Sequence, residues 1–307
     1  MKRKTGQTGF SRPQPGCKCG YVTIAGRPNV GKSTLLNRIL SQKIAIIADK
    51  PNTTRNRILG VKTTKTAQLI FLDTPGIHEP KKELNKYMVA QALAAASESD
   101  LICLLIQADQ PWHEMDLFTL EKLRELSLPM VLVINKIDRV EKPALLPIID
   151  RSRNLGPFKE IVPVSAIEGE GIEQLVAATL PYLPEGVPLF PEDMTTDQAE
   201  KFWVSELIRE KIINLTHQEI PYATAVKVEE WKETEKLIVI RAIIYVERDS
   251  QKGIIIGQAG QMIKKIGQQS REEVEQILGC KIFLELMVKV SKDWTRSRDT
   301  LKRMGYE

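Results

Sequence analysis

The segment Gly26-Arg-Pro-Asn-Val-Gly-Lys-Ser33 constrains the fold of this chain more than any other feature. It fits the pattern GxxxxGK[ST] and lies between an expected strand at 21–25 and an expected helix at 32–40. In that context the glycines let the backbone curl so that its N–H groups face a row of phosphates, and the helix adds the positive end of its dipole. The residues expected to bind phosphate in this loop are Gly26, Asn29, Val30, Gly31, Lys32, Ser33 and Thr34.

Two side chains of this loop have specific expected roles. Lys32 would reach the β- and γ-phosphates of a nucleotide, and the Ser33 hydroxyl would ligate Mg²⁺. The alternative is a turn rich in glycine and proline that binds nothing, but the strand before it and the helix after it favour phosphate binding. The pattern by itself does not distinguish ATP from GTP.

From residue 21 to about 183, short β-rich runs alternate with amphipathic helical stretches. This alternation predicts an α/β domain with a mostly parallel sheet and helices on both faces. Strands are expected at 21–25, 57–61, 68–72, 101–106, 130–134 and 161–164, and helices at 32–40, 83–96, 114–126, 144–155 and 171–180. The second and third strands are joined by a short Thr/Lys turn, so we expect them to form a hairpin. The longest apolar run, 101–106, is far shorter than a membrane span and predicts a buried strand.

The pattern breaks near residue 183, where three prolines within ten residues exclude a continuous helix or a central strand. We interpret 184–197 as an interdomain linker, 21–183 as a nucleotide-binding domain and 198–307 as a second domain. Residues 1–20 lack apolar periodicity and are expected to be a disordered tail. Cys17 and Cys19 form a CxC pair in this tail, and we treat the pair as incidental, because a zinc site needs a second pair or added histidines.

A second motif, Asp73-Thr-Pro-Gly76, follows the expected strand at 68–72. Asp73 could hold Mg²⁺ through a water molecule, and Gly76 could bring its N–H close to a γ-phosphate. A plain type I turn would also explain this short motif. The loop Asn52-Thr53-Thr54-Arg55 offers a threonine that could complete the Mg²⁺ shell; both threonines are candidates, and we favour Thr54.

The choice of base depends on Asn135-Lys136-Ile137-Asp138, which ends the strand at 130–134. The Asp138 carboxylate could accept two hydrogen bonds from guanine, whereas adenine lacks both donors. Lys136 could lie over the base, Asn135 could brace the loop, and the backbone after Ser165 at Ala166 could meet guanine O6. The phosphate loop, DTPG, NKxD and Ser165-Ala166 each follow the carboxyl end of a strand, where open α/β sheets bind ligands. An ATPase or kinase would leave the NKxD residues unexplained, so a GTP-binding domain is predicted.

The second domain contains a GxxG segment, Gly257 to Gly260, in front of an expected helix at 261–278. Further elements are expected as a helix at 198–214, strands at 223–231, 236–246 and 281–290, and a last helix at 293–304. This order is typical of a type II KH domain, an α+β module that clamps single-stranded RNA against the GxxG loop. The stretch 251–307 has 11 basic and 7 acidic residues, a net charge of +4, which fits an anionic partner. The candidate RNA-binding residues are Lys252, Gly257, Gln258, Ala259, Gly260, Lys264 and Lys265.

Together these motifs resemble those of the Era family of bacterial GTPases. The stretches GRPNVGKST, NTTR, DTPGIHEP, NKID and VSA all match the family pattern, and the resemblance covers nearly everything after residue 20. It implies a cytoplasmic, monomeric GTPase that uses Mg²⁺, binds 16S rRNA near its 3′ end and acts in assembly of the 30S subunit. It also implies peripheral contact with the inner membrane, although no amphipathic anchor stands out in the sequence.

The rate of hydrolysis is expected to be low. Ile77 follows DTPG, at the position where Ras-like GTPases have a glutamine that orients the attacking water. A monovalent cation could substitute, because Asn29 matches the asparagine that ligates K⁺ in related potassium-activated GTPases; the alternative is that Asn29 only shapes the loop. Two functional hypotheses follow: a switch in which GTP alters how the KH face is presented, or an RNA-binding scaffold with GTP as a structural ligand.

Overall fold

The computed structural model describes residues 16–80 and 82–306. The chain divides into two compact units, each described here by itself. Within the described residues, the first unit comprises 16–45, Arg57–His78 and Gln91–Asp197, and the second comprises Ile46–Asn56, 79–80, 82–90 and 198–306. Two short segments from the first half of the chain therefore belong to the second unit.

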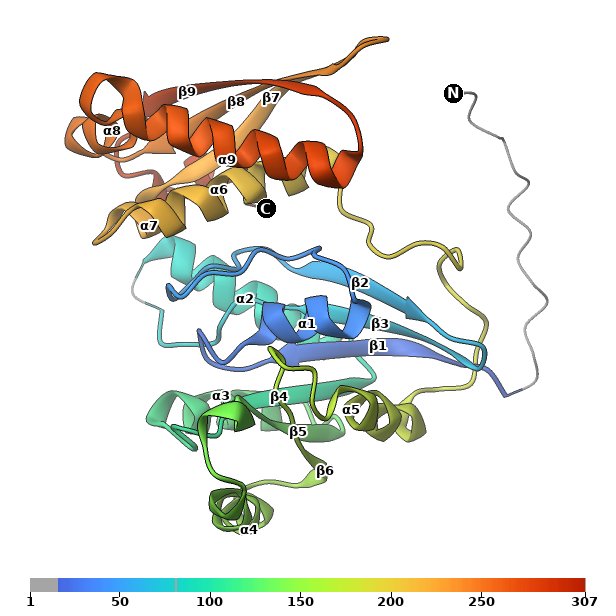
Figure 1. The fold of residues 1–307 in the computed structure, drawn as a ribbon. Helices are drawn as coiled ribbons and strands as arrows, with labels where there is room; N and C mark the ends of the chain where they lie inside the picture. The colour runs from blue at the N-terminus through green and yellow to red at the C-terminus, as the bar shows by residue number, and fades with distance from the viewer. Residues whose placement is uncertain (1–15, 81, 307) are drawn as a thin grey trace. The chain divides into compact units, whose positions relative to one another are not determined.

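The first unit is built on a six-stranded sheet of order β2-β3-β1-β4-β5-β6 (Figure 1). Its strands are β1 (Lys18–Ala25), β2 (Ile58–Thr63), β3 (Ala67–Asp73), β4 (Leu101–Gln107), β5 (Met130–Asn135) and β6 (Phe158–Pro163). Only β2 runs antiparallel to its neighbour, and it forms the predicted hairpin with β3. All the other pairs are parallel, so the ends of β1, β3, β5 and β6 that precede the predicted motifs reach one edge of the sheet.

Helices cover both faces of this sheet, as the alternating pattern predicts. One face packs against α1 (Lys32–Leu40) and α5 (Ile172–Thr179), and the other packs against the C-terminal part of α2 (Glu83–Ser97), α3 (Glu114–Arg124) and α4 (Leu145–Leu155). In β5, Val131 and Val133 face the first layer, whereas Leu132 and Ile134 face the second. Because both faces are covered, every residue of β5 is buried, which explains its unbroken apolar sequence.

The first strand begins earlier than predicted. β1 starts at Lys18, so residues 18–20 of the predicted tail belong to the sheet, where they pair with β3. Cys19 is buried among apolar side chains of that edge. Residues 1–15 of the predicted tail lie outside the described residues.

The predicted linker is held against the edge of the sheet. The Val61 N–H donates to the Thr195 carbonyl at 2.7 Å, and the Thr196 hydroxyl donates to the Leu59 carbonyl at 2.7 Å. These bonds occupy groups of β2, the outermost strand, that would otherwise face solvent unpaired. Within the first unit the segment is therefore an ordered strap, although the predicted domain boundaries at 183 and 198 stay predictions.

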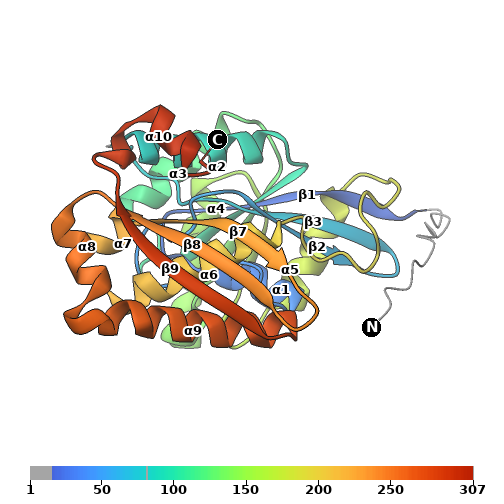
Figure 2. The ribbon, with the colours of Figure 1, turned by 90° about the horizontal axis from the view of Figure 1, so that it is seen from above.

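The second unit has a three-stranded sheet of order β7-β8-β9, whose strands lie side by side in Figure 2. β7 is antiparallel to β8, and β8 is parallel to β9. The elements run α6 (Glu200–Leu215), α7 (Ile220–Ala223), β7 (Ala225–Glu233), β8 (Ile238–Val246), α8 (Asp249–Ile256), α9 (Gln261–Leu278), β9 (Ile282–Val290) and α10 (Arg298–Arg303). The predicted order is confirmed, with two helices added to it.

The addition that matters for the site is α8. The sequence predicts only a glycine-rich turn between β8 and α9, whereas the structure has a helix of eight residues directly before the GxxG loop. Gln251 stabilises its first turn, because the side-chain oxygen accepts from the N–H groups of Glu247 and Arg248 at 2.9 and 3.2 Å. Among the helices of the described residues, none combines the length and apolar character that a bilayer crossing requires.

Candidate functional site

The phosphate loop has the curled backbone that its glycines predict. Gly26 and Gly31 have φ angles of 155° and 97°, and Asn29 adopts the left-handed region at 65°. A Cβ atom on Gly26 would lie 2.7 Å from the Leu105 carbonyl, and one on Gly31 would lie 2.3 Å from the Asn135 side-chain nitrogen. Glycine is therefore required at both positions by space as well as by conformation.

The side chains predicted to hold phosphate and metal converge below this loop. Lys32 is buried and donates to the carbonyls of Gly26 and Arg27 at 3.1 and 2.9 Å. Burial lowers the pKa of Lys32 to about 8, and the nearby Asp73 carboxylate partly opposes that shift. The Ser33 hydroxyl donates to Asp73 at 2.6 Å. Two oxygens so close together fit a hard cation such as Mg²⁺, which prefers hydroxyl, carboxylate and water ligands.

The DTPG loop lies against the phosphate loop. The Thr74 hydroxyl donates to the Ile24 carbonyl at 2.9 Å, and the Ile77 N–H donates to the Gly26 carbonyl at 3.2 Å. A Cβ atom on Gly76 would lie 2.6 Å from Pro28, so only glycine allows this approach. The Ile77 side chain is completely buried in the core between β4, β5 and α3. It is a core residue, which agrees with the prediction that it orients no water.

The predicted guanine residues also come together. The Ser165 hydroxyl donates to the Asp138 carboxylate at 2.5 Å, which fixes the orientation of the carboxylate. Asn135 braces the loop as predicted, because its side-chain nitrogen donates to the Val30 carbonyl at 2.8 Å. The Ala166 N–H, predicted to meet guanine O6, donates here to the Asn135 side-chain oxygen at 3.0 Å. Lys136 adopts a left-handed conformation, and its ammonium group reaches a carbonyl of the phosphate loop.

The two candidate threonines lie in the second unit, and both are buried. The Thr53 hydroxyl donates to the Lys50 carbonyl of its own loop at 2.7 Å, and the Thr53 carbonyl accepts from Arg209. Thr53 therefore has a structural role in this loop. The preference for Thr54 as a metal ligand stays a prediction.

The GxxG loop opens α9 as predicted. Gly257 and Gly260 have φ angles of 73° and 74°, and Ala259 between them also lies in the left-handed region at 49°. The next helix presents its N-terminal N–H groups beside this exposed loop, an arrangement that favours a phosphate backbone. Of the predicted basic residues, Lys264 extends toward the adjoining groove, whereas Lys265 is exposed and does not line it.

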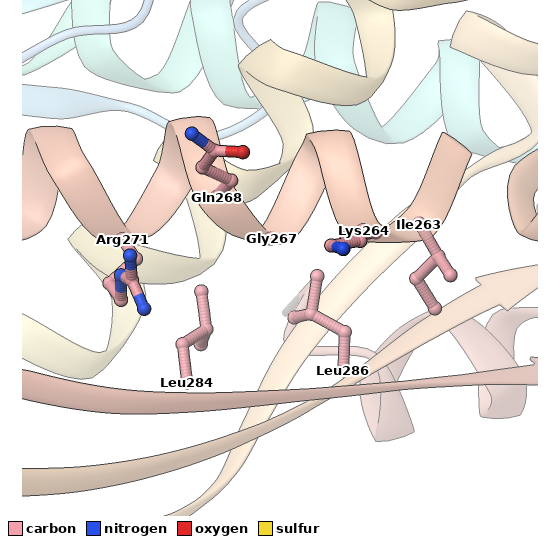
Figure 3. Close-up of a pocket in the computed structure, with 7 residues that line it drawn as sticks. All are labelled: Ile263, Lys264, Gly267, Gln268, Arg271, Leu284 and Leu286. Carbon is pink, nitrogen blue, oxygen red and sulfur yellow. The ribbon is translucent and has the colours of Figure 1, made fainter. Parts of the chain in front are cut away.

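The groove itself lies between α9 and β9 (Figure 3). Its volume is about 370 Å³. Leu284 and Leu286 of β9 form an apolar floor, and Lys264, Gln268 and Arg271 stand along the helix. An apolar floor with charged and amide groups on one wall suits flat bases joined by phosphates. Sequence reasoning missed its other lining residues, Ile263, Gly267, Gln268, Arg271, Leu284 and Leu286. The spacing 264, 268, 271 marks one helix face and could have indicated the wall.

The CxC pair shows no metal-like arrangement. Cys17 is half-buried, Cys19 is buried, and burial raises the pKa of the Cys19 thiol. Residues 16–80 and 82–306 contain no group of three or more His, Cys, Asp or Glu side chains placed to hold a metal ion.

The fold and the converging motifs define a P-loop GTPase domain followed by a KH domain. Two family models agree: one described as a 50S ribosome-binding GTPase matches residues 21–136, and one described as a KH domain matches residues 219–295. GTPase Era of Geotalea uraniireducens (strain Rf4) is 53% identical over 291 residues, covering 94% of this chain and 98% of that protein. The chain therefore belongs to the Era family of GTPases, as its motifs suggest.

Further relatives support this assignment. GTPase Era of Syntrophus aciditrophicus (strain SB) is 51% identical, covering 94% of this chain and 95% of that protein. The crystal structure of an Aquifex aeolicus Era variant bound to GDP·AlF4⁻ is similar, with a TM-score of 0.91 and 46% identity over 94% of this chain and 99% of that one. An Era structure in complex with MgGDPNP and nucleotides 1506–1542 of 16S ribosomal RNA has a TM-score of 0.92 and 45% identity over the same shares.

Proposed function

We propose that this protein is a GTP-hydrolysing switch that binds 16S rRNA near its 3′ end and acts in assembly of the 30S subunit. The groove between α9 and β9 carries the RNA part of this proposal, because Lys264 and Arg271 stand above an apolar floor large enough for bases. The Era structure with nucleotides 1506–1542 of 16S ribosomal RNA supports the choice of RNA.

Coupling between nucleotide and RNA is supported by the composition of the second unit. Residues 46–56 and 79–90, which include the NTTR loop, pack with the KH elements in that unit. Ile46 joins the core formed by α6 and β8, and Leu84 and Met88 join a cluster around Trp294. A nucleotide that draws the NTTR loop away would therefore disturb the packing of the unit that holds the RNA groove.

In the GTPase reaction, Lys32 would neutralise the β- and γ-phosphates, and the N–H groups of the phosphate loop would hold their oxygens. Ser33 directly, Asp73 through a water and Thr54 would hold Mg²⁺. The Era structure in complex with MgGDPNP supports Mg²⁺ as the metal. Bound there, Mg²⁺ offsets the charge that develops on the transferred phosphoryl group. Asp138 would select guanine, with Ser165 holding its carboxylate in place. With Ile77 in the core, no side chain at that position can position water, and hydrolysis is slow.

The direct test is a titration of labelled single-stranded RNA matching the 3′ end of 16S rRNA, at fixed salt. It is run with a non-hydrolysable GTP analogue, with GDP and without nucleotide, and repeated with a scrambled strand. Tight, sequence-dependent binding that weakens in GDP is expected. Binding that ignores both sequence and nucleotide would refute the switch.

Two matched variants locate the RNA on the protein. Arg271→Ala removes a charge from the groove, whereas Lys265→Ala removes a charge from the same helix outside it. We expect Arg271→Ala to weaken RNA binding about tenfold and to reduce the slope of log affinity against log salt concentration by about one. Lys265→Ala should have a smaller effect on both. Equal losses in the two variants would contradict specific use of the groove.

We further propose that Asn29 ligates K⁺ and that K⁺ raises the turnover rate. Its exposed position and left-handed backbone at the phosphate loop support this role. Turnover is measured in KCl and in NaCl for the parent protein and for Asn29→Ala. Faster turnover in K⁺ that disappears in Asn29→Ala is expected; equal rates in both salts, with the variant unchanged, would exclude a K⁺ role.

The second candidate is an RNA-binding scaffold that uses GTP as a structural ligand, and the burial of Ile77 favours it. Asp138→Asn, which should prefer xanthine nucleotides, allows a test with a non-hydrolysable xanthosine analogue. Assembly that proceeds with this analogue alone would support the scaffold, and assembly that stalls at a bound complex would support the switch. The family resemblance also underlies our proposal of a cytoplasmic monomer with peripheral contact at the inner membrane, testable by sedimentation with and without anionic vesicles.

A further inference from the structure

A buried polar network beneath the phosphate loop is not accounted for by any of the nucleotide-binding motifs. It consists of Arg27, Gln107 and Asp116, which are 8%, 5% and 0% exposed. Arg27 belongs to the loop itself, Gln107 ends β4, and Asp116 lies in the first turn of α3. All three residues belong to the first unit.

The contacts in this network form a continuous chain from α3 to the phosphate loop. Asp116 is held by the His113 N–H at 3.0 Å and forms an ion pair with Arg27, with 3.1 Å between the carboxylate oxygen and Nε. A terminal nitrogen of Arg27 donates to the Gln107 side-chain oxygen at 3.0 Å. The Gln107 side-chain nitrogen then donates to the Asn29 carbonyl at 2.6 Å. Because Arg27 occupies the oxygen of the amide, the amide nitrogen must face the loop.

Gln107 has a counterpart in the adjacent strand. Gln107 and Asn135 are paired across β4 and β5, and each donates its side-chain amide to a carbonyl of the phosphate loop. The Asn29 carbonyl accepts from the buried Gln107 amide at 2.6 Å and also from the Lys136 ammonium at 2.8 Å. The Val30 carbonyl accepts from Asn135 at 2.8 Å. Asn135 belongs to the NKxD motif, whereas no motif covers Gln107.

Because the peptide bond is planar, the two hydrogen bonds from Gln107 and Asn135 also orient the N–H groups of the residues that follow. In a planar trans peptide the carbonyl and the N–H of the next residue point in opposite directions. Holding the Asn29 carbonyl toward β4 therefore turns the Val30 N–H away from the sheet edge, and holding the Val30 carbonyl does the same for the Gly31 N–H. These are the N–H groups that a GxxxxGK[ST] loop offers to phosphate.

We propose that Gln107 is a positioning residue of the nucleotide site: oriented by the Arg27–Asp116 pair, it fixes the Asn29–Val30 peptide so that the Val30 N–H faces the phosphates. The inference rests on the phosphate role proposed for the loop. A buried ion pair is seldom stabilising relative to apolar side chains of the same size, so this network is better explained by the conformation that it specifies. The left-handed backbone of Asn29, uncommon for a residue other than glycine, is the conformation that it maintains.

The test measures binding of fluorescently labelled GDP and of a labelled non-hydrolysable GTP analogue, together with thermal unfolding of the nucleotide-free protein. Gln107→Leu removes both hydrogen bonds while keeping the size of the side chain. Gln107→Glu keeps the acceptor for Arg27 but places an oxygen against the Asn29 carbonyl. The matched control is Gln110→Leu, an exposed glutamine three residues further along.

We expect Gln107→Leu to weaken binding of both nucleotides about threefold to tenfold, the range that loss of one hydrogen bond gives, and Gln107→Glu to weaken it more. Gln107→Leu should also unfold at a somewhat lower temperature, because buried Arg27 loses an acceptor, so affinity is measured well below that temperature. Gln110→Leu should bind as the parent does. Parent-like affinity in Gln107→Leu would overturn the proposal. So would a loss of affinity that is fully explained by unfolding of the variant at the temperature of the binding assay.

A double-mutant cycle separates positioning from a general loss of structure. If Asp116 acts through Gln107, Asp116→Asn should weaken GDP binding in the parent and have little further effect in Gln107→Leu. Additive effects on affinity would overturn the proposed path. Lys32→Ala serves as the reference for the site itself: if the parent and Lys32→Ala bind GDP equally, the phosphate role of the loop fails rather than the role of Gln107.

Discussion

The guanidinium carbon of Arg55 lies 5.6 Å from the centre of the Trp294 ring. Tyr306 stacks on the same tryptophan at 5.8 Å, and Arg55 lies 5.8 Å from the tyrosine ring as well. Arg55 is 2% exposed, so the last residue of the NTTR loop is a buried cation within the second unit. Its terminal nitrogens donate to four uncharged oxygens, the Thr224, Pro221 and Tyr222 carbonyls and the Tyr306 hydroxyl.

Arg55→Met should therefore destabilise the second unit by about 2–4 kcal/mol, because several buried oxygens lose their donors and the contact with the two rings is lost. Arg55→Lys should be destabilising too, since an ammonium group cannot match the planar fork. Amide hydrogen exchange in β7 and α10 measures the change. Arg57→Met, which removes an exposed pair with Glu98, is the control and should alter stability by less than about 0.5 kcal/mol. Equal exchange in the two methionine variants would contradict the role assigned to Arg55.

The two glycines of the GxxG loop should respond differently to substitution by alanine. A Cβ atom on Gly257 would lie 2.6 Å from the Met262 Cβ and 2.9 Å from its backbone nitrogen, whereas a Cβ on Gly260 meets nothing within 4 Å. Gly260→Ala should cost only the strain of a left-handed backbone, about 1 kcal/mol. Gly257→Ala should displace the start of α9 and weaken RNA binding more strongly. The RNA titration measures both variants, and a larger loss in Gly260→Ala would contradict this account.

The strap at 184–197 should depend on one buried amide. Gln68 accepts from the Leu189 and Phe190 N–H groups at 2.7 and 2.9 Å and donates to the Phe190 carbonyl at 2.8 Å. In Gln68→Leu these three backbone groups lose their partner, so the strap should detach more often. Cleavage by a glutamate-specific protease at Glu185 and Glu192 should become several-fold faster. Gln42→Leu, at an exposed glutamine, is the control; equal cleavage rates in the two variants would contradict the role of Gln68.

The four thiols should separate into two classes as pH rises. Burial raises the pKa of Cys103 to about 12 and also raises the pKa of Cys19, whereas Cys17 and Cys280 are only half-buried. An alkylating reagent must reach the sulfur and reacts with the thiolate, so native Cys17 and Cys280, which are partly exposed, should be alkylated first, and Cys103 should stay unmodified up to pH 9. Mass spectrometry of the native protein measures this, and the unfolded protein, in which all four should react, is the control. Modification of native Cys103 at pH 9 would show that β4 opens readily.

Elements bounded by glycine are predicted best. α9 begins and ends where the sequence predicts, because Gly260 and Gly279 adopt positive φ angles at its two ends. α1 begins as predicted after Gly31, which has a positive φ angle, and its predicted end is capped by Ser41. β6 is predicted less well: the apolar run indicates 161–164, whereas the strand is Phe158–Pro163. β6 is the edge of the sheet and is only partly buried, so its sequence has neither the unbroken apolar run of β5 nor a clear alternation.

The residues of the candidate site also differ in how well the sequence predicts them. Residues that act through the backbone or through a motif, such as Gly31 and Asp138, can be found in the sequence because their chemistry requires a fixed local spacing. Gln107 and the groove residue Leu286 cannot, since their roles arise from strands that pair across long stretches of chain. No local pattern distinguishes Gln107 from any other glutamine that ends a strand.

The burial of Ile77 limits which substitutions can raise the rate of GTP hydrolysis. The position that supplies a water-orienting glutamine in Ras-like GTPases is occupied here by a side chain that holds α3 to the sheet. Ile77→Gln would thus place an amide in an apolar interior and would not deliver it to the phosphate. A lineage under selection for faster hydrolysis could not gain a water-orienting group by that substitution, and its evolution would have to act on other residues of the site or on an external partner.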